Sequence, residues 1–160
     1  MNATTTERTA SGACLCGTVR FVARGVPEKF AACHCEMCRR WTGSALLDLD
    51  VPVENVEWSG EEHIRTFQSS DWAERAWCDR CGSNLWFRMT QDNEWSGSYG
   101  IPLGLFDDAS GFEMSTEIFI DQKPDSFAYA GTGRAVLTRA ECVAKFPALD
   151  DATSQGSDVT

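Results

Sequence analysis

Short runs of alternating apolar and polar residues occur along most of this chain, as they do in strands that bury one face. In the run 18–24, Val19, Phe21 and Ala23 fall on the same face. The run 114–120 alternates in the same way. Further β-like runs, separated by Gly, Ser, Asp or Pro, lie at 46–51, 56–58, 64–67, 72–77, 85–89 and 127–130. The pattern therefore predicts a mainly β fold.

Helical patterns are few. A turn or so follows Cys35 and extends through Trp41, and a second stretch at 138–145 would end before Pro147. Neither helix is long enough to organise the fold by itself. We therefore expect antiparallel sheets with one or two short helices.

The length and composition of the chain fit one globular domain. It has 160 residues and a hydrophobic content of 42%. Residues 1–9 and 148–160 are rich in Thr, Ser and Asp, so we expect a flexible N-terminus and a flexible acidic C-terminal tail. Between them we find no linker and no repeat, which places one domain at residues 10–147.

The charge and the apolar runs of the chain exclude several classes of partner. The formal net charge is −10, from 24 acidic and 14 basic residues, which disfavours nucleic acid and anionic lipid. No run approaches the roughly 18 apolar residues of a membrane span, and residues 1–13 lack the apolar segment of a secretory signal. We therefore expect a cytoplasmic protein, in which clustered cysteines serve as metal ligands or redox groups rather than disulfides.

Seven of the eight cysteines lie in three compact groups. The groups are Cys14-x-Cys16-Gly17, Cys33-His34-Cys35-x-x-Cys38 and Cys78-x-x-Cys81-Gly82. Four thiolates from the first and third groups would fill a tetrahedral site, a set that favours Zn²⁺. The glycine after each pair lets the backbone fold back so that amides point at sulfur. A disulfide or a redox pair would not explain both glycines, but spacing alone leaves open whether Cys33 and Cys35 replace either pair.

The middle group has three thiolates, and the missing fourth ligand points to function. Cys33, Cys35 and Cys38 can hold a second zinc and leave one position open, as catalytic zinc sites do. A thiol that binds there would lose its proton, because a divalent cation favours the thiolate. The triad would thus prepare a sulfur nucleophile.

Two other interpretations of the triad stay open on spacing. His34, His63 or Cys142 could complete a second closed structural site. His34 is an awkward ligand, since in an extended segment it points away from its neighbouring cysteines. A reactive redox triad without metal would fit the same spacing. As individual residues, we expect Cys142 to be a small buried side chain and His63 a surface histidine.

Order, spacing and flanking residues agree with one known family in three segments. They are 12–21 (GACLCGTVRF), 33–40 (CHCEMCRR) followed by Thr42-Gly43-Ser44, and 75–85 (RAWCDRCGSNL). These segments resemble the glutathione-dependent formaldehyde-activating family, also called the CENP-V/GFA domain. A looser similarity at 105–108, 118–120 and 123–124 extends the resemblance over residues of about 10 to 147.

The resemblance implies a β-tent fold of antiparallel sheets that zinc clamps together. It also implies a structural zinc at Cys14, Cys16, Cys78 and Cys81 and a second zinc at Cys33, Cys35 and Cys38. The family's name-giving reaction joins formaldehyde and glutathione into S-(hydroxymethyl)glutathione, and it is classed with the carbon–sulfur lyases because it is reversible. We therefore expect a zinc-dependent lyase that acts on glutathione and an aldehyde. The alternative is a noncatalytic zinc module that serves structure or protein contacts.

Residues next to the triad are candidates for binding the substrate. Arg39 and Arg40 could hold a glutathione carboxylate, although a solvated or structural arginine pair explains them equally well. Trp41 and Trp95 are candidate pocket walls. For the general acid or base we consider the acidic pair at 107–108.

Overall fold

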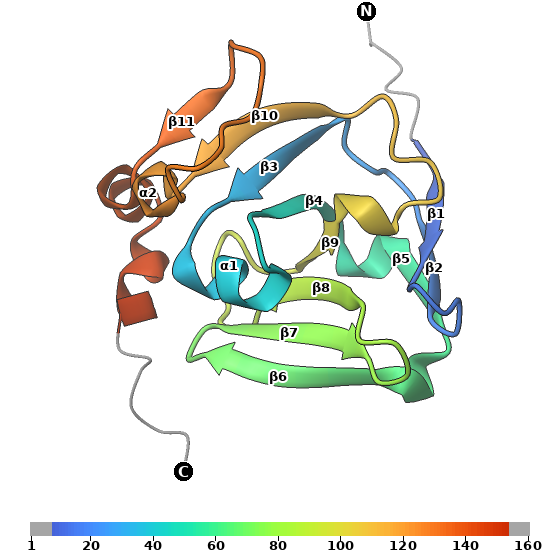
Figure 1. The fold of residues 1–160 in the computed structure, drawn as a ribbon. Helices are drawn as coiled ribbons and strands as arrows, with labels where there is room; N and C mark the ends of the chain where they lie inside the picture. The colour runs from blue at the N-terminus through green and yellow to red at the C-terminus, as the bar shows by residue number, and fades with distance from the viewer. Residues whose placement is uncertain (1–7, 154–160) are drawn as a thin grey trace, which may run out of the picture.

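Two β-sheets form the fold of residues 8–153, the part of the chain that this computed structural model describes (Figure 1). The smaller sheet has the strand order β1 (Ala10–Ala13), β2 (Arg20–Ala23) and β5 (Val56–Ser59). The larger sheet has the strand order β11-β10-β3-β4-β9-β8-β7-β6. Its strands are β3 (Lys29–Cys33), β4 (Leu46–Pro52), β6 (Ile64–Ser70), β7 (Ala73–Cys78), β8 (Asn84–Met89), β9 (Ser98–Pro102), β10 (Glu113–Ile118) and β11 (Ala135–Leu137). The predicted mainly β fold is confirmed.

Both predicted helices are present. The first, α1 (Glu36–Thr42), follows Cys35 and ends at Gly43, which takes the left-handed region at a φ of 82°. The second, α2 (Arg139–Lys145), begins with a capping box that Thr138 and Glu141 form. Short 3₁₀-helices connect other elements: η1 (Val53–Asn55), η2 (Glu61–His63), η3 (Leu103–Leu105), η4 (Ile120–Gln122) and η5 (Pro147–Thr153).

The larger sheet is mixed, although its pattern predicts antiparallel pairing throughout. Strand β10 runs parallel to both β3 and β11, whereas the other strand pairs are antiparallel. Parallel neighbours need a long connection, and the segment from β4 to β9 supplies it between β3 and β10. Figure 1 shows β10 beside β3 above α1, and β6, β7 and β8 below it. The sheet thus curves around the helix.

The strand expected at 127–130 is absent from the structure. Arg134 donates from Nη2 to the Tyr129 carbonyl (2.8 Å) and from Nη1 to the Ala130 carbonyl (3.0 Å). Backbone carbonyls need one partner, and here a guanidinium takes the place of a neighbouring strand. The alternating pattern alone does not show whether these carbonyls bond to a neighbouring strand or to an arginine side chain.

The main apolar core lies between the two sheets. Val19, Phe21 and Ala23, which share the predicted face around β2, are at most 2% exposed. Phe21 and Ala23 belong to β2 of the smaller sheet and Val19 directly precedes it, while Leu49 and Val51 approach from β4 of the larger sheet. Burial of these side chains holds one face of the larger sheet against the smaller sheet. The opposite face of β4 remains available for polar residues.

Part of the segment that the sequence predicts to be a flexible tail forms a short helix. Instead of leaving the fold after residue 147, the chain forms η5, in which the Leu149 N–H donates to the Phe146 carbonyl (3.0 Å). The apolar side chain of Leu149 is half-buried, which gives a physical reason for the ordered turn. Residues 1–7 and 154–160, which belong to the two expected flexible ends, lie outside the described residues.

Within residues 8–153, no helix has the length and apolar character needed to cross a membrane.

Candidate metal centres and the cavity beside the triad

The four-cysteine cluster joins the two sheets. Cys14 and Cys16 follow β1 of the smaller sheet, while Cys78 ends β7 of the larger sheet and Cys81 lies in the next turn. All four sulfurs lie within 4.8 Å of one another. Cys16 Sγ is 3.5 Å from Cys14 Sγ and 3.9 Å from Cys78 Sγ, and two sulfurs on a tetrahedral zinc ion are about 3.8 Å apart. The donor set and its spacing therefore fit zinc.

Two glycine turns aim these sulfurs at a common point. Gly17 has a φ of 75° and donates its N–H to the Cys14 carbonyl (3.0 Å). Gly82 has a φ of 77° and donates to the Cys78 carbonyl (2.8 Å). A side chain would be strained at either φ, so the glycine after each cysteine pair permits the turn that the spacing predicts.

The three-cysteine group lies where β3 meets α1. Cys33 is the last residue of β3, Cys35 caps α1, and Cys38 lies within the helix. The three sulfurs lie within 4.8 Å of one another, and in the described part of the chain this group has no fourth ligand. The group fits a metal with three sulfur ligands and one open position.

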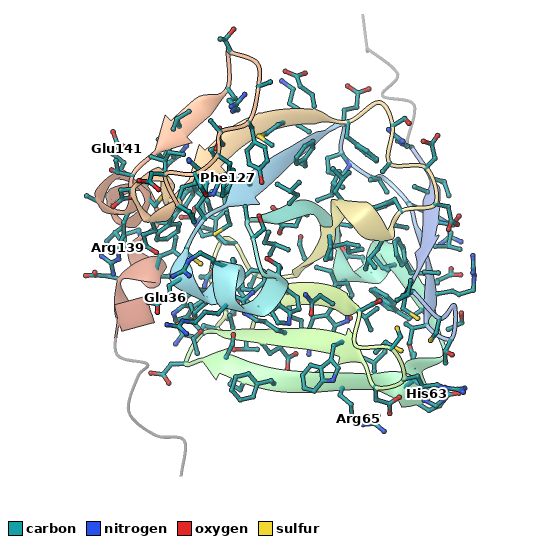
Figure 2. The ribbon with its side chains drawn as sticks, in the orientation of Figure 1. Glu36, His63, Arg65, Phe127, Arg139 and Glu141 are labelled. Atoms are coloured by element: carbon teal, nitrogen blue, oxygen red, sulfur yellow. The ribbon has the colours of Figure 1, made fainter. Side chains whose placement is uncertain are left out.

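The three candidate fourth ligands lie elsewhere. His34 is buried with its Nε2 2.7 Å from Glu117 Oε2, and it faces away from the triad as the extended segment predicts. His63 belongs to η2, and Figure 2 shows it at the lower right, far from α1. Cys142 is 0% exposed in α2, as a small buried residue. None of these three residues therefore completes the triad to a closed four-ligand site.

The thiols of the triad have pKa values shifted in opposite directions. Hydrogen bonds with the Cys33 and Cys38 thiols, together with the charge of Arg75, lower the pKa of Cys35 to about 3. The contact with Cys35 raises the pKa of Cys33 well above its usual value. One thiolate is thus stable without a metal, and a divalent cation would favour loss of the remaining protons.

The triad lines a cavity of about 560 Å³ whose floor is the larger sheet. Cys33 pairs with Leu46 on β4, so Asp48 lies two residues along on the same face. Asp50 of β4 pairs with Gly100 of β9, and Gly100 pairs with Phe87 of β8. Phe87 in turn pairs with Arg75 of β7. Residues paired across neighbouring strands share a face, which brings four strands' side chains to one floor.

Aromatic side chains and the C-terminal segment form the walls. Trp95 from the loop after β8 meets Phe146 from the end of α2, edge to face, with ring centroids 4.5 Å apart. Leu149 of η5 and Arg139 of α2 also line the cavity. Figure 2 shows Arg139 on the same side of the molecule as Glu36 of α1, another lining residue. The cavity thus lies between α1 and the C-terminal segment.

The predicted substrate residues are divided between cavity and surroundings. Arg40 and Trp95 line the cavity. Arg39 and Trp41 are absent from its described lining, because one helical turn cannot present every residue to the same side. The Trp41 ring instead packs against Arg75, 4.9 Å from the guanidinium carbon.

The acidic pair at 107–108 lies away from the triad. Asp107 accepts from the Ser11 hydroxyl (2.7 Å) and pairs with Arg20 (3.6 Å), both residues of the smaller sheet. The carboxylates that line the cavity are Asp48 and Asp50 of β4 and Glu36 of α1. The acidic pair considered as general acid or base is therefore not part of the described lining of the cavity.

Sequence reasoning missed most of the charged residues of the cavity: Arg75, Asp48 and Asp50 on its floor, and Glu36 and Arg139 around it. The run 46–51 alternates Asp48 and Asp50 with leucines, so a polar face within an apolar strand was visible. Arg75 is a single base in the apolar run 72–77, a weaker signal. Burial raises the pKa of Asp48 well above its usual value, which marks this carboxyl as unlike a surface aspartate.

Comparison with known proteins agrees with this geometry. The sequence model of a family described as "Glutathione-dependent formaldehyde-activating enzyme" matches residues 9–122. A Schizosaccharomyces pombe protein named "Uncharacterized lyase" is 31% identical over 119 residues, which cover 74% of this chain and 84% of that protein. A Halomonas elongata protein named "Putative glutathione-dependent formaldehyde-activating enzyme" is 34% identical over 83 residues, covering 47% of this chain and 53% of that protein. The family match contains both cysteine groups and ends before α2 and η5.

Proposed function

Because this chain belongs to the glutathione-dependent formaldehyde-activating family, we propose that it is a zinc-dependent enzyme of the carbon–sulfur lyase class. Its substrates would be glutathione and formaldehyde, and its product S-(hydroxymethyl)glutathione, with the reverse reaction on the same site. The names of the two relatives, a lyase and a formaldehyde-activating enzyme, support this assignment.

One observation carries the proposal: the three-cysteine group, and not the four-cysteine cluster, lines the large cavity. Four sulfurs fill a tetrahedral zinc site, whereas three leave one position for a substrate atom. The cavity adjoins that incomplete set, and its volume of about 560 Å³ is in the range of small-molecule sites. A purely structural second site would have no need of such a cavity.

The two cysteine groups would have different roles. Cys14, Cys16, Cys78 and Cys81 would hold a structural zinc, and Cys33, Cys35 and Cys38 the second zinc. Bound to the triad, zinc would supply an open coordination position and favour the thiolate form of an incoming thiol. The chain's own residues would hold the substrate around that position.

In the proposed reaction, a sulfur–carbon bond forms as the π electron pair of the aldehyde moves to oxygen. The thiol loses one proton and the new hydroxyl gains one, so no further reactant is consumed. Asp48 is the floor carboxyl that we assign to this proton transfer, since it shares a face with Cys33 and burial favours its protonated form. The walls around Trp95 and Phe146 would limit the access of water.

Metal analysis and exchange NMR test the proposal together. Freshly purified protein should contain near two zinc ions per chain, and Cys35→Ala should lose one of them while keeping the fold. Cys142→Ala is the matched control, because this buried cysteine lies outside both groups, and it should retain both metals.

Exchange NMR on formaldehyde, glutathione and their adduct then measures the reaction. Wild-type protein at micromolar concentration should speed interconversion above the spontaneous rate, and Cys35→Ala should not. Unchanged metal content and turnover after substitution of all three triad cysteines would refute the role of the triad. Absence of acceleration by wild-type protein would refute the reaction while leaving the metal sites intact.

A further inference from the structure

A single buried arginine sits against the triad. Arg75 is 4% exposed, and its Nη1 and Nη2 atoms each lie 3.7 Å from Cys38 Sγ. Its guanidinium carbon lies 4.9 Å from the centre of the Trp41 ring and 5.1 Å from that of Phe87. Two aromatic rings thus hold the planar guanidinium beside the sulfur, where it stays charged.

The usual partner of a buried guanidinium is missing. In the described residues no carboxylate lies within salt-bridge distance of Arg75, and its Nε has no hydrogen-bond partner. Asp48 interacts electrostatically with Arg75, but burial raises the pKa of its carboxyl and favours the neutral form. Since a buried cation is unfavourable without nearby negative charge, the sulfurs of the triad and a ligand bound beside them are the groups left to supply it. Arg75 also lines the cavity, so its positive charge can attract an anionic ligand that binds there.

The two cysteine groups differ in this respect. At the four-cysteine cluster the donors near sulfur are neutral: the Val19 N–H donates to Cys14 Sγ (3.3 Å), and Cys81 Sγ lies 3.3 Å from Ser83 Oγ. Cys16 of that cluster is exposed, so water can screen its charge. The triad, in which Cys38 is buried and Cys33 and Cys35 are half-buried, has a full positive charge in place of these neutral donors.

We propose that Arg75 makes the triad selective for an anionic sulfur ligand, because its guanidinium offsets the charge that a fourth thiolate adds. This inference rests on the proposed function in one respect, namely that the triad holds a divalent metal. Three thiolates on such an ion leave one negative charge, and a fourth thiolate makes two. When the positive charge of Arg75 beside Cys38 is included, the net charge of the site with four thiolates is −1 instead of −2. A neutral ligand adds no charge, so it has no comparable attraction to the arginine.

The consequence is a preference among ligands of similar size. A thiol would bind as its thiolate in preference to a neutral nitrogen ligand such as imidazole. Arg75 would act through charge and not by touching the aldehyde, and so it is a positioning residue rather than a catalytic one.

Cobalt-substituted protein makes this preference measurable without turnover. Ligand exchange at the triad changes the visible absorption of cobalt, so titration with glutathione and with imidazole gives two dissociation constants. In Arg75→Gln the ratio of glutathione affinity to imidazole affinity should fall on the order of tenfold or more. A merely structural defect would weaken both ligands together and leave the ratio unchanged.

Two further variants keep the test decisive. Arg75→Met replaces the guanidinium by an uncharged chain of similar length that suits the aromatic rings, and it should show the same fall in ratio. Arg75→Lys keeps the charge and should restore most of the preference. If the glutamine and methionine variants lose the triad metal, retention by the lysine variant supports the charge, and loss there too overturns the proposal.

Arg88→Gln is the matched control. Arg88 lies on the neighbouring strand β8, also packs against an aromatic ring, and does not line the triad cavity within the described chain. Its ratio should equal that of wild-type protein. An unchanged ratio in well-folded Arg75→Met would overturn the inference even if wild-type protein accelerates the formaldehyde reaction. Conversely, a fallen ratio without any turnover would leave the inference standing and remove only the proposed reaction.

Discussion

Glu117 connects two partners inside the protein, and its replacement by glutamine tests what holds the triad segment in place. Its side chain is 5% exposed, with Oε2 2.7 Å from His34 Nε2 and Oε1 2.6 Å from Arg134 Nε. His34 lies between two triad cysteines, while Arg134 holds the carbonyls of the segment at 129–131. Glu117 therefore ties the triad segment to the C-terminal part of the fold.

The expected loss follows from burial. Removal of one partner from a buried ion pair costs about 3–5 kcal/mol, because the other charge is left unpaired. Glutamine keeps the shape and one acceptor oxygen, so we expect Glu117→Gln to lower the free energy of unfolding by about 3 kcal/mol, the lower end of that range. For a chain of this length, the melting temperature should fall by roughly 6–12 °C.

Thermal melts of the zinc-loaded protein, followed by circular dichroism, measure this loss. The matched control is Glu57→Gln, whose carboxylate also lies 2.7 Å from an arginine, Arg24, but is 66% exposed. Exposed ion pairs contribute little, so the control should melt with wild-type protein. Equal shifts in the two variants would refute the reasoning, since they differ chiefly in burial.

Three further predictions concern packing, metal release and the cavity wall. Gly12→Ala should destabilise by roughly 1–3 kcal/mol in urea unfolding, because a Cβ there would lie 2.3 Å from the Leu105 carbonyl oxygen; Gly104→Ala, which meets nothing within 4 Å, should not. A colorimetric chelator should remove zinc from the triad faster than from the four-cysteine cluster, and a single release phase for both metals would contradict their open and closed geometries. Phe146→Ala removes the contact with Trp95 and should raise the KM for glutathione by roughly twofold to tenfold with little change in kcat; an unchanged KM in exchange NMR would count against this wall as a substrate contact.

The strands and metal groups that sequence could predict are those with strong local patterns. The spacing within each cysteine group is local, so all three groups could be recognised in the sequence. The pairing of the first group with the third joins Cys16 to Cys78, which are 62 residues apart, and it rests on the family resemblance and not on spacing. Strand β2 shows clear alternation, whereas β1 (ASGA) and β3 (KFAAC) are built largely from small residues that carry no such signal. At β10 the alternation predicts two residues too many, because the chain turns at Phe119 with a φ of 56°.

The cavity could not be predicted, because its residues are brought together only by the order and register of the strands in the larger sheet. Asp48 and Arg75 belong to β4 and β7, and the order of strands between them depends on β9, whose segment SYGIP has a weak pattern. Gly100 of β9 leaves room for the Asp48 carboxyl, since a Cβ there would lie 2.3 Å from Asp48 Oδ2. Such close approaches are tertiary facts that single-sequence periodicity does not contain.

The C-terminal wall of the cavity lies far along the chain from both cysteine groups. All seven cysteines of the two groups lie before residue 82, whereas Arg139, Phe146 and Leu149 come from a segment after the family match ends. Mutations in this segment would change the wall of the cavity without changing either group of cysteines. Exchange of α2 and η5 between relatives is therefore a route by which one metal scaffold can acquire new substrates, in evolution or by design.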